Sequence, residues 1–183
     1  MSLPEFKAWP KIPRRNKPVI VTEKLDGTNG IIHVGEDGVV TAGSRSRWLV
    51  HGADNFGFAD WVDEHKIELR GLGAGYHYGE WYGAGIQRTY GLTEKRFALF
   101  NASLWNSNHL PPACCEIVPV LGAGFEADGV VKRLLAELIA GGSRAVPGFM
   151  KPEGVVVFHT AAGTLQKVLI EGDDMPKGEQ EAA

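Results

Sequence analysis

The sequence predicts an α+β fold, built mainly from short strands, with two helices separate from them. Two runs rich in β-branched residues, Gly30–Val34 and Val39–Ala42, are joined by a short glycine turn, which predicts a β-hairpin. Residues 126–140 carry apolar side chains at helical spacing and are followed by two glycines, which predicts a helix with one buried face. A second amphipathic helix is predicted over residues 54–71, with an N-cap at its start and a glycine at its end.

The remaining apolar runs predict further strands. These runs cover residues 18–21, 96–101, 111–120 and 155–158, and each is short and rich in β-branched or aromatic residues. The strand over residues 18–21 opens with a proline, a position that strands tolerate well.

Composition favours one globular domain. The chain has 183 residues, of which 44% are hydrophobic and 22% are charged, and its net charge is −3. We expect a single domain over residues 1–172, a flexible acidic tail over residues 173–183 and no C-terminal accessory domain. The chain has no apolar stretch of membrane-spanning length and no secretory signal, so we expect a cytoplasmic protein. The net charge argues against broad coating of nucleic acid but leaves room for a local basic groove.

The most informative stretch is Thr22–Asn29, where Lys24 follows a buried strand and precedes an Asp26-Gly27 turn. A lysine at the end of a buried strand, close in sequence to the carboxylate of Asp26 and the amide of Asn29, is surrounded by polar groups, which suggests a functional role for its amine. The alternative interpretation is a solvated lysine at the end of a hairpin, because long side chains reach water easily. The local spacing alone does not decide between the two.

These residues resemble motif I of the covalent nucleotidyltransferases, the superfamily of ATP-dependent ligases and capping enzymes, whose pattern is Lys-x-Asp-Gly. The longer pattern Glu-Lys-x-x-Gly-Thr-Asn, which starts at Glu23, is similar to that of the RNA ligase 2 family. The resemblance implies that Lys24 is the nucleophile and that the nucleotide is bound by Glu23, Asp26, Gly27 and Asn29. For Asn29, a purely structural role in the turn is the alternative.

A second motif lies in Tyr78–Gln87. The pattern Gly-Glu-x-x-Gly-x-Gly-Ile-Gln resembles motif III of the RNA ligase 2 family. The resemblance implies that Glu80 accepts a hydrogen bond from a ribose hydroxyl of the nucleotide, a role that suits a carboxylate.

Two further motifs resemble nucleotide-contacting segments of the same family. Ser44-Arg45 matches a serine or threonine followed by arginine, which implies that Arg45 contacts the ribose and phosphates, with Arg47 as the alternate. Phe100 precedes Asn101 in a segment that resembles motif IIIa, which implies that its ring stacks on adenine. Stacking on a base contributes about 1–3 kcal/mol.

The last two motifs concern the phosphates. Glu153-Gly154 before an apolar strand resembles motif IV, which implies that Glu153 acts near a divalent metal. Residues 165–170 resemble motif V, whose lysines reach the α-phosphate. Lys167 matches the second lysine, whereas Leu165 occupies the position of the first, and this is the main departure from the pattern.

The resemblance implies two antiparallel sheets with flanking helices and an ATP cleft between them. It implies an ATP-dependent RNA ligase that uses Mg²⁺ or Mn²⁺, with Lys24, Glu153 and Lys167 as catalytic residues. A lysyl-AMP intermediate would pass AMP to a 5′-phosphate end, which a 3′-hydroxyl then seals. The resemblance implies an RNA substrate, either nicked duplex or single-stranded ends, with DNA as the alternative. We expect the protein to act as a monomer or with a partner protein that supplies a missing domain.

Two alternatives stay open. The first is an adenylyl- or guanylyltransferase that passes the nucleotide to another acceptor. The second is a catalytically impaired module that binds nucleotide or RNA ends, which suits the leucine at position 165. The order of the motifs and the presence of Lys24, Glu80 and Glu153 favour the ligase.

Overall fold

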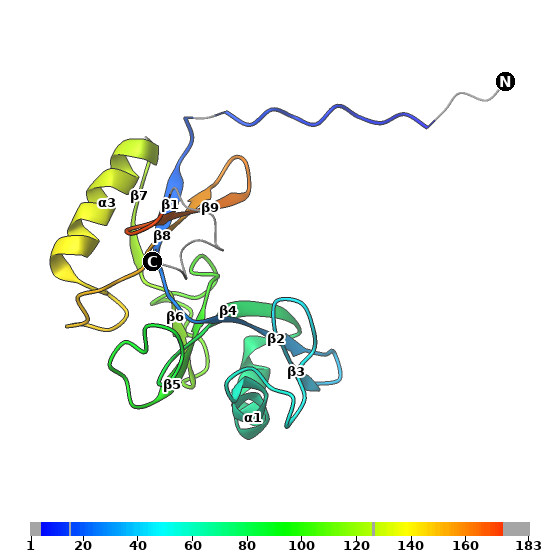
Figure 1. Cartoon of the computed structure of the whole chain (residues 1–183). Helices are drawn as coiled ribbons and strands as arrows, with labels where there is room; N and C mark the ends of the chain where they lie inside the picture. The colour runs from blue at the N-terminus through cyan, green and yellow to red at the C-terminus, as the bar shows by residue number, and fades with distance from the viewer. Residues whose placement is uncertain (1–4, 15, 126, 174–183) are drawn as a thin grey trace.

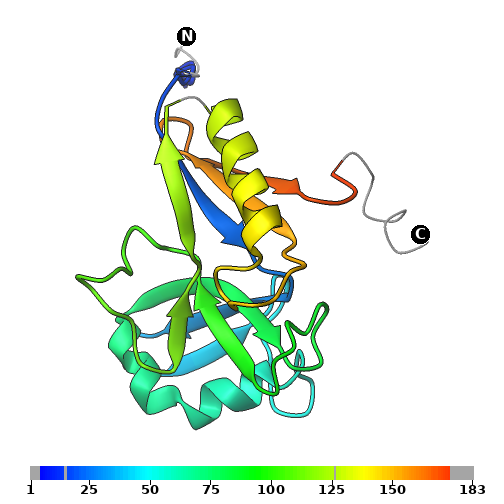
Figure 2. The same cartoon turned by 90° about the vertical axis from the view of Figure 1, so that its left-hand side faces the viewer.

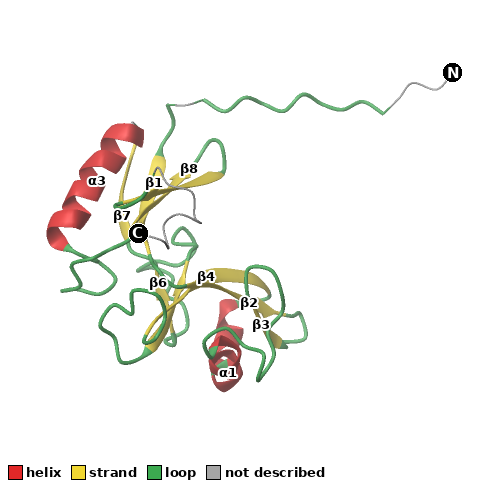
Figure 3. Cartoon of the chain, in the orientation of Figure 1, coloured by secondary structure: helices red, strands yellow, loops and turns green. Residues whose placement is uncertain are grey.

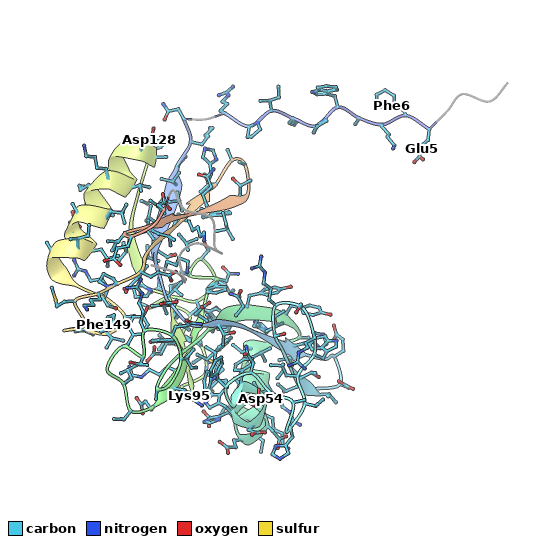
Figure 4. The ribbon with its side chains drawn as sticks, in the orientation of Figure 1. Glu5, Phe6, Asp54, Lys95, Asp128 and Phe149 are labelled. Atoms are coloured by element: carbon cyan, nitrogen blue, oxygen red, sulfur yellow. The ribbon has the colours of Figure 1, made fainter. Side chains whose placement is uncertain are left out.

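The structure is a computed structural model that describes residues 5–14, 16–125 and 127–173. Two sheets form two lobes, one carrying α3 and the other carrying α1 (Figure 1). Residues 5–14 extend away from both lobes, with Glu5 and Phe6 at the far end of that segment (Figure 4). Apart from residue 173, the predicted tail over residues 173–183 lies outside the described residues.

The first sheet has the strand order β7-β1-β8-β9. Its strands are β1 (Val19–Lys24), β7 (Val120–Gly124), β8 (Gly154–His159) and β9 (Thr164–Leu169). The second sheet has the order β3-β2-β4-β5-β6. Its strands are β2 (Thr28–Val34), β3 (Val40–Gly43), β4 (Gly75–Gly83), β5 (Lys95–Leu99) and β6 (Cys115–Ile117).

The predicted fold class is confirmed, with one difference in strand direction. Neighbouring strands pair antiparallel in both sheets except β5 and β6, which are parallel. Parallel neighbours need a long connection that returns the chain to the starting end of the sheet. Residues 100–114 form this connection. The predicted hairpin is the antiparallel pair of β2 and β3.

The first sheet is covered on one face by α3 (Ala127–Gly141), which is the helix predicted over residues 126–140 (Figures 2 and 3). Alternate residues of β1 and β8 face this helix, because successive strand residues point to opposite faces. The buried side chains of this core are Val19, Val21, Leu134, Leu138, Val155 and Val157. Burial of this apolar surface holds α3 on the sheet.

The second sheet packs on α1 (Phe58–Glu64), and the largest fully buried side chains of the contact are Phe58, Trp81 and Phe97. Gly30 and Gly79 allow the rings to lie directly against the strands. A Cβ on Gly30 would be 2.6 Å from the Phe58 ring, and a Cβ on Gly79 would be 2.5 Å from the Phe97 ring.

The predicted helix over residues 54–71 is a series of shorter helices. After α1 come α2 (Lys66–Leu69) and the 3₁₀ helix η1 (Arg70–Leu72). The N–H of Ala59 donates to the Asp54 carboxylate at 2.8 Å, so Asp54 supports the helix start from outside the helix, beside α1 (Figure 4). The chain ends this helical region at Gly73, which has a positive φ of 82°. Within the described residues, none of the helices has the length and apolar character that crossing a membrane requires.

The chain passes between the two sheets in two places. Residues 25–27 connect β1 to β2, and residues 118–119 connect β6 to β7. The second connection touches the end of β1, since the N–H of Glu23 donates to the carbonyl of Pro119 at 2.9 Å. The prediction of a single strand over residues 111–120 was wrong. This segment contains β6, the connection over residues 118–119 and the first residue of β7, and β6 and β7 belong to different sheets.

Candidate active site

Lys24 is the last residue of β1, at the point where the chain leaves the first sheet for the second. Its Nζ lies 2.5 Å from Oε2 of Glu153, the residue immediately before β8. Lys24 is opposite Gly154, the residue after Glu153, in the antiparallel pairing of β1 with β8. The side chains of Lys24 and Glu153 therefore meet at the same end of these two strands. Burial raises the pKa of the Glu153 carboxyl, and the hydrogen bond and charge of Lys24 act against that rise. The result is a partly buried ion pair around one amine.

Glu80 lies in β4, opposite Asn29 of β2, and its side chain is buried. Its carboxylate accepts two hydrogen bonds, from the N–H of Gly27 at 3.0 Å and from Nδ2 of Asn29 at 3.2 Å. Burial raises the pKa of Glu80 to about 7, although the nearby charge of Lys24 lowers it. Glu80 therefore holds the turn after Lys24 and places a second carboxyl group near the amine.

Gly27 is required by the close packing of this turn. A Cβ at this position would lie 2.3 Å from the carbonyl oxygen of Trp81 and 2.8 Å from Cβ of Tyr82. Contacts this short do not occur in folded proteins without a shift of the backbone. The glycine of the Lys-x-Asp-Gly pattern is therefore explained here by steric fit against β4.

Asp26 is held by two residues that the sequence analysis did not single out. Nε of Arg88 donates to Oδ2 of Asp26 at 2.9 Å, and the backbone N–H of Asp26 donates to the hydroxyl of Tyr90 at 2.8 Å. Nη1 of Arg88 also donates to the carbonyl of Lys151 at 3.1 Å. The Arg88 guanidinium thus joins the loop after Lys24 to the loop before Glu153.

The segment that carries Arg88 has an unusual backbone. Gln87, Thr89 and Tyr90 have positive φ angles of 45°, 55° and 55°, a conformation that residues with a Cβ rarely adopt. Tyr90 is buried, and its ring packs on Tyr82 and Phe149. The only sequence signal for this segment was its place directly after the Gly85-Ile86-Gln87 pattern.

Lys167 lies on the same face of the first sheet as Lys24. Lys167 of β9 is opposite Val156 of β8, and Val156 is opposite Thr22 of β1. Thr22 lies two residues before Lys24 in the same strand. Residues directly opposite each other share a face, as do residues two apart in one strand. By the same register, Leu165 is also on this face, where its side chain is 69% exposed.

Glu23 points to the other face of the first sheet and is buried. Its Oε2 accepts hydrogen bonds from the N–H groups of Arg144 at 2.7 Å and Ala145 at 3.0 Å. Its Oε1 is buried and has no hydrogen-bond partner within the described part of the chain. In this structure Glu23 ties the loop after α3 to β1, and its role toward a nucleotide stays a prediction.

Two predicted residues lie apart from the Lys24 cluster. Arg45 is exposed in the turn after β3, and among the described residues its side chain makes no hydrogen bond or ion pair. Phe100 follows β5, and its N–H donates to the carbonyl of Tyr78 at 2.9 Å. This register places its ring on the same sheet face as Glu80, with 41% of the residue exposed. Phe100 is therefore open to a ligand beside Glu80.

Six of the predicted residues thus gather where the sheets meet: Lys24, Asp26, Gly27, Asn29, Glu80 and Glu153. A lysine at a strand end, surrounded by carboxyl groups between two sheets of an α+β fold, is the arrangement of a covalent nucleotidyltransferase domain. The chain belongs to the RNA ligase family, whose model matches residues 17–168.

Solved structures support the fold. A Naegleria gruberi RNA ligase variant with ATP and Mn has a TM-score of 0.62 at 21% identity, covering 92% of this chain and 52% of its own. Another such variant with ATP and Mn has a TM-score of 0.59 at 20% identity, covering 84% and 49%. The Naegleria gruberi RNA ligase with PPi has a TM-score of 0.58 at 22% identity, covering 84% and 50%.

The chain therefore spans about half the length of the structures that it matches. No curated protein matches the chain.

Proposed function

We propose that this chain is an ATP-dependent RNA ligase that forms a lysyl-AMP intermediate at Lys24. The observation that carries the proposal is the position of Lys24, whose amine meets Glu153 at the junction of the two sheets, 2.5 Å from the carboxylate. Membership of the RNA ligase family supports it. The Naegleria gruberi structures with ATP and Mn support the choice of nucleotide and metal.

In the first step the Nζ of Lys24 attacks the α-phosphorus of ATP. An N–P bond forms, the bond between the α-phosphorus and the bridging oxygen breaks, and pyrophosphate leaves. The lysine ammonium must lose a proton for this attack, because only a neutral amine is nucleophilic. Glu153 is a proton acceptor in contact with the ammonium, and burial raises the pKa of its carboxyl, which favours proton uptake.

The nucleotide would bind on the sheet faces that carry these side chains. Phe100 stacks on adenine, and Glu80 orients the ribose from its position opposite Asn29. Asp26 and Gly27 shape the turn after the nucleophile, and their contacts to Arg88 and Glu80 keep that turn in place.

The phosphates would be met by cations. Lys167 reaches the α-phosphate from the face that it shares with Lys24, and Arg45 contacts the ribose and phosphates from the turn after β3. Charge that develops on phosphoryl oxygens is stabilised by such preorganised positive groups. Glu23 contributes to nucleotide binding indirectly, because its buried side chain faces away from Lys24 and holds the loop after α3 against β1.

A divalent ion fits the donor set. Among the described residues, no group of three or more acidic, histidine or cysteine side chains gathers into a protein-only metal site. Mg²⁺ is commonly held by one or two carboxylates together with substrate phosphates and water. Glu153 would supply the carboxylate, and the ion would neutralise phosphate charge when ATP is bound.

The later steps use RNA ends. The AMP moves from Lys24 to a 5′-phosphate, forming a phosphoanhydride as the N–P bond breaks. A 3′-hydroxyl then attacks the 5′-phosphorus, a phosphodiester forms and AMP leaves. This sealing reaction would take place in the cytoplasm and would involve either the chain alone or a partner protein.

The experiment is incubation with α-labelled ATP and, separately, α-labelled GTP, with magnesium or manganese. Label on the intact protein is followed by mass, with Lys24→Ala as the matched variant. We expect one AMP on the wild-type chain, none on Lys24→Ala, and release of the label when RNA with a 5′-phosphate and a 3′-hydroxyl is added. No adduct from either nucleotide on well-folded protein would reject the proposal.

One observation favours a second candidate. Leu165 stands where the motif resemblance places a lysine, and it occupies the face of the sheet that carries Lys24. A chain with weakened phosphate chemistry would bind nucleotide or RNA ends without sealing them. Nucleotide binding without a covalent adduct would support this candidate, and a labelled adduct that no RNA discharges would support transfer to another acceptor.

A further inference from the structure

Beyond Glu80, the second sheet carries a group of aromatic rings on the face opposite α1. The register pairs Ile31 with Tyr78 and His33 with Tyr76, in line with Asn29 and Glu80. Residues two apart on one strand share a face, so all of these side chains point to the side that carries Glu80. Trp48 joins them from the turn after β3, where it forms a bridge to Gly43. We call His33, Trp48, Tyr76 and Tyr78 the aromatic surface.

The rings of the aromatic surface are exposed to solvent and pack against one another. Trp48, Tyr76 and Tyr78 are 50%, 55% and 53% exposed. The Tyr76 and Tyr78 rings are nearly parallel, at 17°, with centroids 6.4 Å apart. His33 packs against Tyr76 at 4.5 Å, and Trp48 stacks near Tyr76 at 6.3 Å. Exposed parallel rings are the feature by which proteins bind unpaired bases.

The charges around the aromatic surface suit a polyanion. The turn before Trp48 presents Arg45 and Arg47, both exposed, and is closed by the N–H of Ser44 donating to the carbonyl of Arg47 at 2.8 Å. Among the described positions of β2, β3 and β4 that face this side, Glu80 is the only acidic one. Cations attract any polyanion, and the stacking rings beside them favour a polyanion that carries bases, which is a nucleic-acid strand.

The surface also leads to the proposed active site. Tyr78 and Tyr76 are two and four residues from Glu80 along β4, which corresponds to about 7 and 13 Å at the usual rise of a strand. Phe100 lies beside Tyr78 through its backbone hydrogen bond. A strand that stacks on these rings would therefore have its end within a few nucleotides of Lys24.

We propose that the aromatic surface binds the unpaired bases of single-stranded RNA next to the end that is sealed. This inference rests on the proposed function and specifies its substrate as RNA with unpaired nucleotides near the end. Stacking tolerates any base, because every base has a π face, so the surface selects for strandedness rather than sequence.

The test is the affinity of a short labelled oligouridine, measured by fluorescence anisotropy at fixed salt, with a blunt RNA duplex of equal length as the comparison. We expect Tyr76→Ala and Trp48→Ala each to weaken oligouridine binding about 5- to 100-fold. Tyr76→Phe keeps the ring and should bind like the wild type. Tyr76→Leu keeps apolar bulk without the ring and should bind as weakly as Tyr76→Ala. Duplex binding should change much less, since its bases are already stacked.

The matched control is Phe125→Ala, which removes an aromatic residue that is 64% exposed at the end of β7 in the other lobe. It should leave oligouridine binding unchanged. Thermal unfolding of each variant verifies that it is folded. Wild-type affinity in Tyr76→Ala, or in Tyr76→Leu, would overturn the inference, and the former result would instead fit a surface for a protein partner.

The two proposals fail in distinguishable ways. Labelling of the wild-type chain with α-labelled ATP needs no RNA, so its failure rejects the ligase and not the aromatic surface. Normal labelling together with ring-independent oligouridine binding rejects the aromatic surface and not the ligase.

Discussion

Nζ of Lys24 lies 2.5 Å from Oε2 of Glu153, although 129 positions separate the two residues in the chain. The antiparallel pairing of β1 with β8 brings them together, because the last residue of β1 is opposite the first residue of β8. The pair is partly exposed, at 22% and 15% of the side chains. A nucleotide or cation can therefore reach it and separate the two charges.

Glu153→Gln tests the carboxylate. The variant keeps the shape of the side chain but removes the negative charge and the proton acceptor beside Lys24. We expect the rate of lysyl-AMP formation to fall about 10²–10⁴-fold, the usual contribution of a positioned acid or base. The measurement is the time course of label transfer from α-labelled ATP. Glu36→Gln, an exposed carboxylate in the turn before β3, is the control. A Glu153→Gln rate within threefold of wild type would contradict the assigned role.

Arg88→Lys tests the contact between the loops that carry Lys24 and Glu153. Arginine donates to Asp26 and to the carbonyl of Lys151 from two nitrogens at once, whereas lysine is a single point charge. We expect kcat for lysyl-AMP formation to fall about tenfold or more, since small misplacements of reacting groups are costly. The KM for ATP should change little, because Arg88 positions the site and does not bind nucleotide.

The control for Arg88 is Arg133→Lys, which alters an exposed pair with Glu137 on α3. It should leave kcat unchanged. Equal losses in kcat and in thermal stability for Arg88→Lys, with a matching rise in KM, would indicate general loosening of the fold instead of positioning.

Glu80→Gln tests the buried carboxyl through pH. The pKa of Glu80 is raised to about 7 from 4.5 by burial. Between these values the unfolded chain ionises while the folded chain keeps its proton, so the free energy of unfolding falls as pH rises. Below pH 4.5 this loss is absent, and above about 7 it is complete. At about 1.4 kcal/mol per pKa unit, the loss is on the order of 3 kcal/mol.

The measurement is urea unfolding of wild type and Glu80→Gln across this pH range, without nucleotide. Glutamine does not ionise, so the stability of wild type minus that of the variant should decrease from pH 4.5 to 7 and then level off. A difference that stays constant, or that increases with pH, would show that Glu80 is ionised in the folded chain throughout.

Gly27→Ala tests the steric fit of the turn. The added Cβ would lie 2.3 Å from the Trp81 carbonyl, so β2 and β4 would have to move apart. We expect a loss of roughly 2–4 kcal/mol in the free energy of unfolding and little lysyl-AMP formation. Gly141→Ala is the control, since no atom lies within 4 Å of a Cβ at that position at the end of α3. That change should be neutral or slightly stabilising, and a stable, active Gly27→Ala would contradict the packing argument.

The sequence predicted the fold class, the hairpin, α3 and the residues that gather at Lys24, because these depend on local patterns and on the order of recognisable motifs. It did not predict that residues 111–120 divide between two sheets. Both parts of that segment are strand-like, and the partners that decide the sheet are β5 and β1, which are remote in sequence. Local patterning carries no information about such partners.

The residues that hold the site in place could not be predicted from the sequence either. Arg88 and Tyr90 lie in a loop whose non-glycine residues have positive φ angles, a conformation that their residue types do not indicate. Their contacts to Asp26 depend on how β4 and β5 place the loop between them against the turn after Lys24. Glu23 was predicted beside the nucleotide, and strand alternation places its side chain on the face away from Lys24.

The register of β9 leads to the last prediction, Leu165→Lys. Leu165 and Lys167 are two apart in β9, opposite Phe158 and Val156 of β8, and so face the side of the sheet that carries Lys24. Because Leu165 is 69% exposed, a lysine is accommodated without burial of its charge. A second cation on this face would stabilise the negative charge that develops on the α-phosphate during attack.

We therefore expect Leu165→Lys to raise the rate of lysyl-AMP formation about three- to tenfold, corresponding to about 0.7–1.4 kcal/mol of transition-state stabilisation. Single-turnover label transfer at saturating ATP measures this rate directly. Leu165→Gln, which is polar and uncharged, should stay at the wild-type rate and so separates the effect of charge from that of polarity. A Leu165→Lys rate equal to or below that of Leu165→Gln would mean that this position of β9 does not face the α-phosphate.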